Sequence, residues 1–218
     1  MILGLDFGTS TTSVSELDAA GDIRLLPIGF QKERYVPSVV VQDESGKFFY
    51  GQEAIALYQT KKVVATPIKN FKNYITDKPS SFENRKEDEV IANFLKYVLD
   101  KVVEVTGYKI YDDNSIEFRV SAPAGWNASQ RTRLLNILVS LGIRISNGEI
   151  VDEPSAAGIN YVDYFLESGE PRRLLVFDMG GGTLDLAVIG ISVDEGAPTV
   201  LAASSQSLAG NKIDDELT

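Results

Sequence analysis

The sequence predicts an α/β fold, a mixed sheet flanked by helices, and three observations carry that prediction. Short strand-like segments open the chain and follow one another across turns. Segments with apolar residues at helical spacing then alternate with further strand-like segments. A late stretch of strand, LLVFDMGGGTLDLAVIGI, is interrupted by three consecutive glycines with an aspartate on either side. The length of 218 residues allows one large domain or two small ones.

The N-terminal part reads mainly as strands. Ile2–Phe7 is an apolar run typical of a buried strand, and Thr11–Leu17 and Ile23–Ile28 follow it across turns. Val36–Gln42 and Lys47–Tyr50 predict a hairpin over the turn DESG. These segments indicate a meander followed by a hairpin.

The clearest helix lies in the middle of the chain. A short helix is expected over Gln52–Gln59, and Pro67 marks a break. Over Asp88–Thr106 the apolar residues fall on one helical face, and Gly107 closes the helix. That face consists of Ile91, Phe94, Leu95, Val98, Val102 and Val105.

Strands and helices alternate through the next part. Ile116–Ala122 alternates as a strand, Asn127–Leu141 predicts a helix stopped by Gly142, and Glu149–Val151 reads as a short strand. Pro154 opens a helix that we expect to end near Glu167. Strands are expected again at Leu174–Phe177, Leu184–Ser192 and Thr199–Ser204, and DDELT begins another helix.

We expect five of these strands to share one mixed sheet with helices on its faces. They are Ile2–Phe7, Thr11–Leu17, Ile23–Ile28, Ile116–Ala122 and Glu149–Val151.

The composition excludes several kinds of chemistry. The chain has no histidine and no cysteine, so acid–base work falls to Asp, Glu, Lys or Tyr. Its 31 acidic and 21 basic residues give a net charge of −10, which argues against nonspecific nucleic-acid binding. No apolar run approaches the ~20 residues of a membrane span, and the N-terminus lacks the basic start of a signal peptide. We therefore expect no nucleic-acid partner, no membrane contact and a cytoplasmic location.

An internal repeat explains the glycines. ILGLDFGTSTTSVSEL and LLVFDMGGGTLDLAVI each contain an apolar strand, an aspartate, an apolar residue, a glycine, a small polar turn and a second strand. Asp6 and Gly8 in the first copy correspond to Asp178 and Gly180 in the second, 172 positions later. Each copy predicts a hairpin with a glycine-containing turn.

Turns of this kind favour phosphate binding. Glycine permits positive φ and close approach of the backbone to a ligand, and consecutive free N–H groups form an anion-binding nest. An acid beside each turn would repel phosphate directly but could hold Mg²⁺ through water molecules. The Walker A and Rossmann glycine patterns are both absent. The alternative is a pair of tight hairpins whose glycines serve turn geometry alone.

The motifs resemble those of the actin-like ATPase superfamily, which has a ribonuclease H-like fold, and most of all the 70-kDa heat-shock chaperones of the DnaK type. GLDFGTSTTSV and LLVFDMGGGTLDLAVIGI are similar to the family's two phosphate loops. VDEPSAAGINY resembles its E-P-[ST]-A-A helix, VSAPAGWNASQRTRL its strand–Pro–helix segment, and SLAGNKIDDEL the opening of its second lobe. VPSVV, YGQEAIALY and TPIKNFKNY resemble its peripheral subdomain. The first motif suits sugar kinases equally well, whereas D-x-G-G-G-T-x-D and E-P-S-A-A point to the chaperones.

The resemblance implies an ATP/ADP site with Mg²⁺. Phosphate contacts would come from Gly8, Thr9, Ser10 and Thr11 on one side and from Gly180, Gly181, Gly182 and Thr183 on the other. Asp6 and Asp178 would hold Mg²⁺ through water.

The resemblance also implies catalytic and relay residues. Lys69 would reach the γ-phosphate and the attacking water, while Glu153 and Asp185 would orient that water and take up its proton; Thr183 belongs to the same group. Pro123 and Arg131 would relay the nucleotide state.

Three of these residues also have structural interpretations. Lys69 could be one more solvated lysine, and Glu153 could simply complement a helix dipole. Asp185 could be an outward residue of an alternating strand.

The implied function is an ATPase whose cycle gates the binding of unfolded peptides, with co-chaperones as partners. Residues 1–172 would form the first lobe, with a core at 1–35 and 115–172 and a peripheral subdomain at 36–114, and residues 173–218 would begin the second lobe. The family's domain is longer, so the chain is expected to be an N-terminal piece of an ATPase, truncated within the second lobe. Without the adenosine pocket it would bind ATP weakly and barely hydrolyse it.

Departures from the family pattern leave other functions open. Asn70 stands where the family has a base, Ala128 where it has an acid, Ala209 where it has a glycine and Ile213 where it has a phenylalanine. An actin-like filament protein and a nucleotide-sensing adaptor with low turnover are the alternatives. A downstream peptide-binding domain would favour the chaperone.

Overall fold

The computed structural model describes residues 1–18, 20–60, 67–75, 81–82, 85–165, 172–191, 199–206 and 209–217. These residues form two compact units. The first comprises Met1–Val120 and Ala128–Glu149, and the second comprises Ser121–Asn127 and Ile150–Thr218. The predicted lobe boundary at residue 172 stays a prediction.

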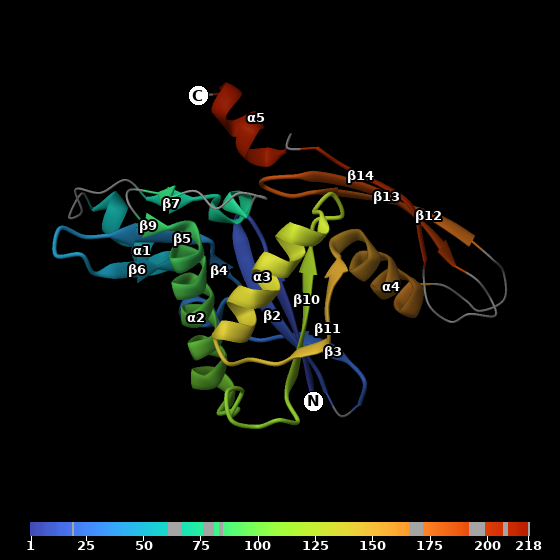
Figure 1. Cartoon of the computed structure of the whole chain (residues 1–218), viewed down its shortest axis with the longest axis horizontal. Helices are drawn as coiled ribbons and strands as arrows, with labels where there is room; N and C mark the ends of the chain where they lie inside the picture. Colours follow the sequence, from blue (N-terminus) through green and yellow to red (C-terminus); the bar gives the residue numbers. More distant parts are fainter. Residues whose placement is uncertain are drawn as a thin grey trace. The chain divides into compact units, whose positions relative to one another are not determined.

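The main sheet is mixed, as predicted (Figure 1). Its order is β11-β10-β1-β2-β3, with β4 paired to β2. β1 is parallel to β10 and antiparallel to β2. The strands are β1 (Ile2–Phe7), β2 (Thr11–Leu17), β3 (Ile23–Leu25), β4 (Val36–Pro37), β10 (Glu117–Ala122) and β11 (Ile145–Asp152). The five strands predicted to share a sheet are therefore all in it.

Helices α2 (Glu87–Thr106) and α3 (Ala128–Ser140) lie against one face of this sheet (Figure 1). Alternation in β1 buries Leu3, Leu5 and Phe7, because successive side chains point to opposite faces. Phe7 packs against Phe94 of α2, with ring centroids 6.3 Å apart. Five of the six residues of the predicted apolar stripe of α2 are buried, whereas Val105, the last of them, is exposed.

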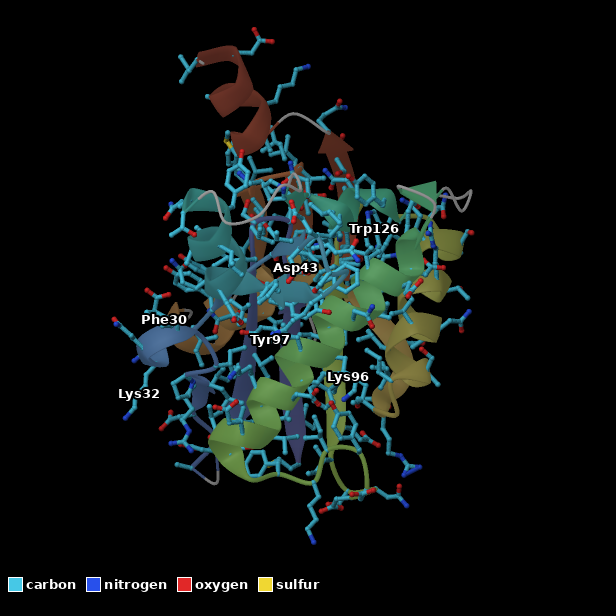
Figure 2. All side chains as sticks on the ribbon, turned by 90° about the vertical axis from the view of Figure 1, so that its left-hand side faces the viewer. Phe30, Lys32, Asp43, Lys96, Tyr97 and Trp126 are labelled. Carbon is cyan, nitrogen blue, oxygen red and sulfur yellow. The ribbon has the colours of Figure 1, made fainter. Side chains whose placement is uncertain are left out.

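A smaller sheet accompanies the main one in the first unit. Its order is β6-β5-β7, with α1 packed on β5 through Ala54, Val39 and Val41. The elements are β5 (Val39–Gln42), β6 (Phe48–Tyr50), α1 (Gly51–Gln59) and β7 (Ile68–Lys69); short pieces are η1 (Phe30–Lys32), η2 (Phe71–Tyr74), β8 (Ser81–Phe82) and β9 (Arg85–Lys86). Tyr97 of α2, labelled in Figure 2, stacks on Tyr50 of β6 with ring centroids 5.0 Å apart. This contact joins the β5–β6 hairpin to the helix.

The second unit contains an antiparallel sheet in the order β12-β13-β14. Its elements are β12 (Arg172–Met179), β13 (Leu184–Ile191), β14 (Thr199–Gln206), α4 (Glu153–Phe165) and α5 (Gly210–Leu217). α4 lies close to β13, since a Cβ on Gly158 would come 2.4 Å from Cδ1 of Ile189. Glycine at this position lets helix and strand approach each other.

Two predicted strand boundaries were wrong by three residues or more, and the strand predicted over Val36–Gln42 is two strands, β4 and β5, which are separated at Ser38 and paired in different sheets. β3 ends at Leu25 rather than at Ile28, before Pro27, which cannot donate to a ladder. β11 begins at Ile145, four residues earlier than predicted, because Asn147 and Gly148 have left-handed φ values of 57° and 66° and break the apolar alternation. α4 ends at Phe165, and the predicted end at Glu167 lies outside the described residues.

Within the described part of the chain, none of the helices is long and apolar enough to cross a membrane.

Candidate functional site

The two repeated hairpins have the same strand register. Asp6 lies opposite Ser13 in the first, and Asp178 lies opposite Asp185 in the second. The residues of the second pair are each 172 positions after their counterparts, and the neighbouring pairs keep that offset. The internal repeat predicted from sequence is therefore a repeat of structure.

The turn of the first hairpin is braced by Ser38, a buried residue between β4 and β5. The Ser38 hydroxyl donates to the carbonyl of Gly8 at 2.8 Å, and its N–H donates to the carbonyl of Ser10 at 2.8 Å. The same hydroxyl lies 3.0 Å from the hydroxyl of Thr12. One side of the turn is thus fixed by a residue far along the sequence.

The turn of the second hairpin is braced by the first residue of α5. Gly210 N–H donates to the carbonyl of Gly180 at 3.1 Å. Inside the turn, Gly180 N–H donates to the carbonyl of Thr183 at 3.0 Å. The carbonyls of Gly8 and Gly180, which occupy equivalent places in the repeat, are therefore both held from outside their own hairpins.

This bracing orients one amide in each turn. The peptide bonds of these two turns are trans, so the N–H that follows a carbonyl points to the opposite side of the chain. The N–H groups of Thr9 and Gly181 consequently point away from the donors that hold Gly8 and Gly180. These two amides are equivalent in the repeat.

The glycines are not required for positive φ, contrary to the expectation from sequence. Neither Gly8 nor Gly180 is left-handed. Gly8 must be glycine for lack of space, because a Cβ there would lie 2.3 Å from the carbonyl oxygen of Thr11. At Gly180 the nearest atom to a Cβ would be the carbonyl oxygen of Thr183 at 3.7 Å, an ordinary contact. The chain around Gly180 would therefore accept a larger residue.

Two carboxylates lie side by side on the second hairpin. Asp178 and Asp185 are directly opposite in register and so point to the same face of the sheet. Asp185 is 1 % exposed, and its Oδ1 has no hydrogen-bond partner among the described residues. A buried carboxylate oxygen in this state is unfavourable for the folded chain. Asp6, in the first hairpin, is exposed.

No group of three or more acidic side chains in the described ranges is close enough together to hold a metal ion directly.

The remaining predicted site residues lie on defined elements. Lys69 is exposed at the end of β7, paired with Val39 of β5. Glu153 is the half-buried first residue of α4. Pro123 is buried in the loop after β10, and Arg131 is half-buried on α3.

The predicted residues divide between the two units. The first unit holds Asp6, Gly8, Thr9, Ser10, Thr11, Lys69 and Arg131, and the second holds Pro123, Glu153, Asp178, Gly180, Gly181, Gly182, Thr183 and Asp185. The structure brings together Asp178 and Asp185 in the second unit. The loop that carries Pro123 also reaches β14 there, since a Cβ on Gly125 would lie 2.4 Å from the Cβ of Ser205.

Comparison with known families decides which family the chain belongs to. A family model described as Hsp70 protein matches residues 47–218. The chain belongs to the Hsp70 family. The matched range includes the whole second hairpin with Lys69 and Glu153, so the specific glycine motif falls inside the Hsp70 match.

Curated relatives extend the likeness to nearly the whole chain. The chaperone protein DnaK of Thermotoga petrophila is 25 % identical over 224 residues, covering 99 % of this chain and 35 % of that protein. DnaK of Metamycoplasma hominis is 27 % identical over 219 residues, covering 99 % of this chain and 34 % of that protein. The chain thus spans about a third of the length of these Hsp70 relatives.

Sequence reasoning missed the contact of Ser38 with the turn of the first hairpin. The residue lies in VPSVV, a stretch that carried the resemblance but was given no role. The hydrogen bond of Ser38 reaches a turn about thirty positions earlier, and local sequence contains no signal for that contact.

Proposed function

We propose that this chain binds the phosphate groups of Mg²⁺-ATP with its two repeated hairpins. The observation that carries the proposal is their common construction. In each hairpin the carbonyl of the first turn glycine accepts a hydrogen bond from a residue outside the hairpin. The N–H of the next residue, Thr9 or Gly181, therefore points in the opposite direction. Backbone N–H groups presented in this way form an anion site.

The residues at the turns would share the phosphate contacts. Gly8, Thr9, Ser10 and Thr11 would serve one side, and Gly180, Gly181, Gly182 and Thr183 the other. Gly180 supports this assignment, because neither its φ nor its packing within the chain requires glycine. Room for a bound phosphate group would explain the absence of a side chain at this position.

The acids of the second hairpin suit a hydrated cation. Asp178 and Asp185 lie side by side, and the buried Oδ1 of Asp185 has no partner in the described part of the chain. A divalent cation nearby would relieve the repulsion between them. Asp6 and Asp178 would hold Mg²⁺ through its water shell, and the ion would neutralise charge on the phosphates.

For hydrolysis we propose roles for three side chains. The Lys69 ammonium would contact the γ-phosphate, while the carboxylates of Glu153 and Asp185 would orient the attacking water and accept its proton. Thr183 would assist at the same place. Positioning and charge stabilisation would supply most of the rate.

The wider function follows the family. ATP hydrolysis in the natural protein that contains this chain would gate the binding of unfolded peptides, in cooperation with co-chaperones in the cytoplasm. Pro123 and Arg131 would relay the nucleotide state. The likeness to DnaK chaperones supports these roles.

Single-turnover hydrolysis by the natural protein tests the catalytic assignment. Lys69→Ala, Glu153→Ala and Asp185→Ala should each lower the rate by about tenfold or more, ~1.4 kcal/mol, with smaller effects on nucleotide affinity. Lys109→Ala, which removes an exposed lysine, is the matched control and should leave the rate unchanged. Wild-type turnover in all three variants would refute the assignment.

A further inference from the structure

The segment Pro67–Ile75 carries Lys69 and has an unusual backbone. β7 ends at Lys69, and Asn70 then adopts a left-handed conformation with φ 57°. The 3-10 turn η2 follows and buries Phe71, whose ring packs against that of Phe94 with centroids 5.0 Å apart. Lys69 is paired with Val39 on one side and is joined to η2 through the left-handed Asn70 on the other, so its position depends in part on how η2 is fixed.

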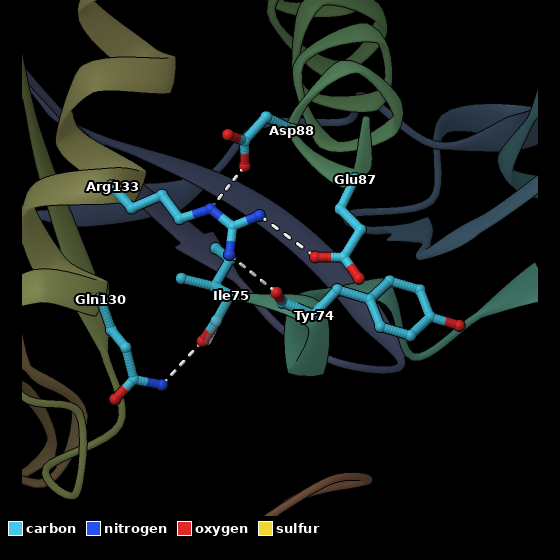
Figure 3. Close-up of polar contacts among 6 residues, drawn as sticks. All are labelled: Tyr74, Ile75, Glu87, Asp88, Gln130 and Arg133. Atoms are coloured by element: carbon cyan, nitrogen blue, oxygen red, sulfur yellow. Dashed lines mark hydrogen bonds and ion pairs between the residues drawn. The ribbon is translucent and has the colours of Figure 1, made fainter. Parts of the chain in front are cut away.

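The end of η2 is held by Arg133 of α3 (Figure 3). Nη1 of Arg133 donates to the carbonyl of Tyr74 at 3.0 Å. Nε donates to Oδ1 of Asp88 at 2.6 Å, and Nη2 to Oε2 of Glu87 at 3.2 Å. One guanidinium therefore joins η2, the first turn of α2 and α3, which uses the rigid fork of arginine donors.

A neighbour on the same helical face adds a second contact. Gln130, one turn before Arg133, donates its side-chain amide to the carbonyl of Ile75 at 2.7 Å (Figure 3). Successive carbonyls at the end of the Lys69 segment are thus held by two side chains of α3. Burying charge in this way is costly, because the side chains of Arg133 and Glu87 are only 12 % and 5 % exposed.

We infer that Arg133, assisted by Gln130, is a positioning residue that fixes the Lys69 segment on α3. This inference rests on the role proposed for Lys69. A residue that only stabilised the fold would lower hydrolysis equally with or without the Lys69 ammonium. A residue that acts by placing Lys69 loses its effect once that ammonium is removed.

The first test needs no nucleotide. Hydrogen–deuterium exchange of the 218-residue chain should be about tenfold faster across 67–75 in Arg133→Met than in the unmodified chain. Arg24→Met is the matched control, because Arg24 also pairs with a buried glutamate, Glu16, in the first unit. It should leave exchange across 67–75 unchanged. Unchanged exchange in Arg133→Met would overturn the inference.

The second test is a double-mutant cycle for single-turnover ATP hydrolysis in the natural protein. Arg133→Met should slow hydrolysis about tenfold when Lys69 is present and less than about twofold in the Lys69→Ala background. Equal losses in both backgrounds would overturn the positioning role. If Arg133→Met does not fold, Gln130→Ala carries both tests, with smaller effects in the same direction.

The two tests separate the inference from the proposed function. If Lys69→Ala itself leaves hydrolysis unchanged, the proposed role of Lys69 is overturned. The exchange measurement still decides whether Arg133 fixes the segment.

Discussion

At the scale of single residues, the buried carboxylate of Asp185 destabilises the folded chain and belongs to the nucleotide site that we propose. It is buried opposite a second carboxylate, and one of its oxygens has no partner among the described residues. Like charges directly opposite on a sheet destabilise it. Ser13, the equivalent residue of the first hairpin, has no charge. The second copy of the repeat therefore carries an electrostatic cost that the first does not.

Asp185→Asn should consequently stabilise the chain in the absence of nucleotide and Mg²⁺. The amide would remove the repulsion and could donate to Asp178, raising the free energy of unfolding by about 1 kcal/mol. Urea unfolding at neutral pH measures this difference. Asp112→Asn, at an exposed turn, is the control for the change in net charge. A less stable Asp185→Asn chain would contradict this account of the pair.

At the scale of elements, apolar patterning located most strands and helices. β1, β10 and α2 follow from alternation or helical spacing, because the residues on their buried faces are apolar. The start of β11 contains no such signal, because Ile145 is followed by four residues that are not apolar before Ile150.

The candidate site was predictable in part for the same reason. The glycine turns and their aspartates are local patterns, and the repeat made them conspicuous. The braces from Ser38 and Gly210, and the contacts of Arg133, depend on tertiary structure. Residues of that kind have no characteristic spacing.

The two turns should respond differently to the same substitution. Gly8→Ala places a Cβ against the carbonyl of Thr11 and should reduce both stability and phosphate binding. Gly180→Ala fits the chain and should change the free energy of unfolding by less than about 0.5 kcal/mol while weakening phosphate binding. Urea unfolding and titration with Mg²⁺-ATP, performed on both variants, separate the two effects. Full binding by Gly180→Ala would mean that this glycine makes no room for a ligand.

At the scale of the whole molecule, the chain consists of two units that each carry one copy of the phosphate hairpin. The central proposal is that both copies bind phosphate groups of one nucleotide. Membership of the Hsp70 family supports it, and the common bracing of the turns supplies a physical reason. Binding can be weak and still be measured residue by residue.

The most direct test is an NMR titration of the ¹⁵N-labelled chain with Mg²⁺-ATP, following backbone amides in both turns. We predict that the amides of Thr9 and Gly181 shift together and saturate with one dissociation constant, and that Gly180→Ala weakens the response of both turns. Exposed turns elsewhere, such as the one at Asp112, should not shift. A response confined to one hairpin, or two different dissociation constants, would contradict the claim that the repeat forms a single phosphate site.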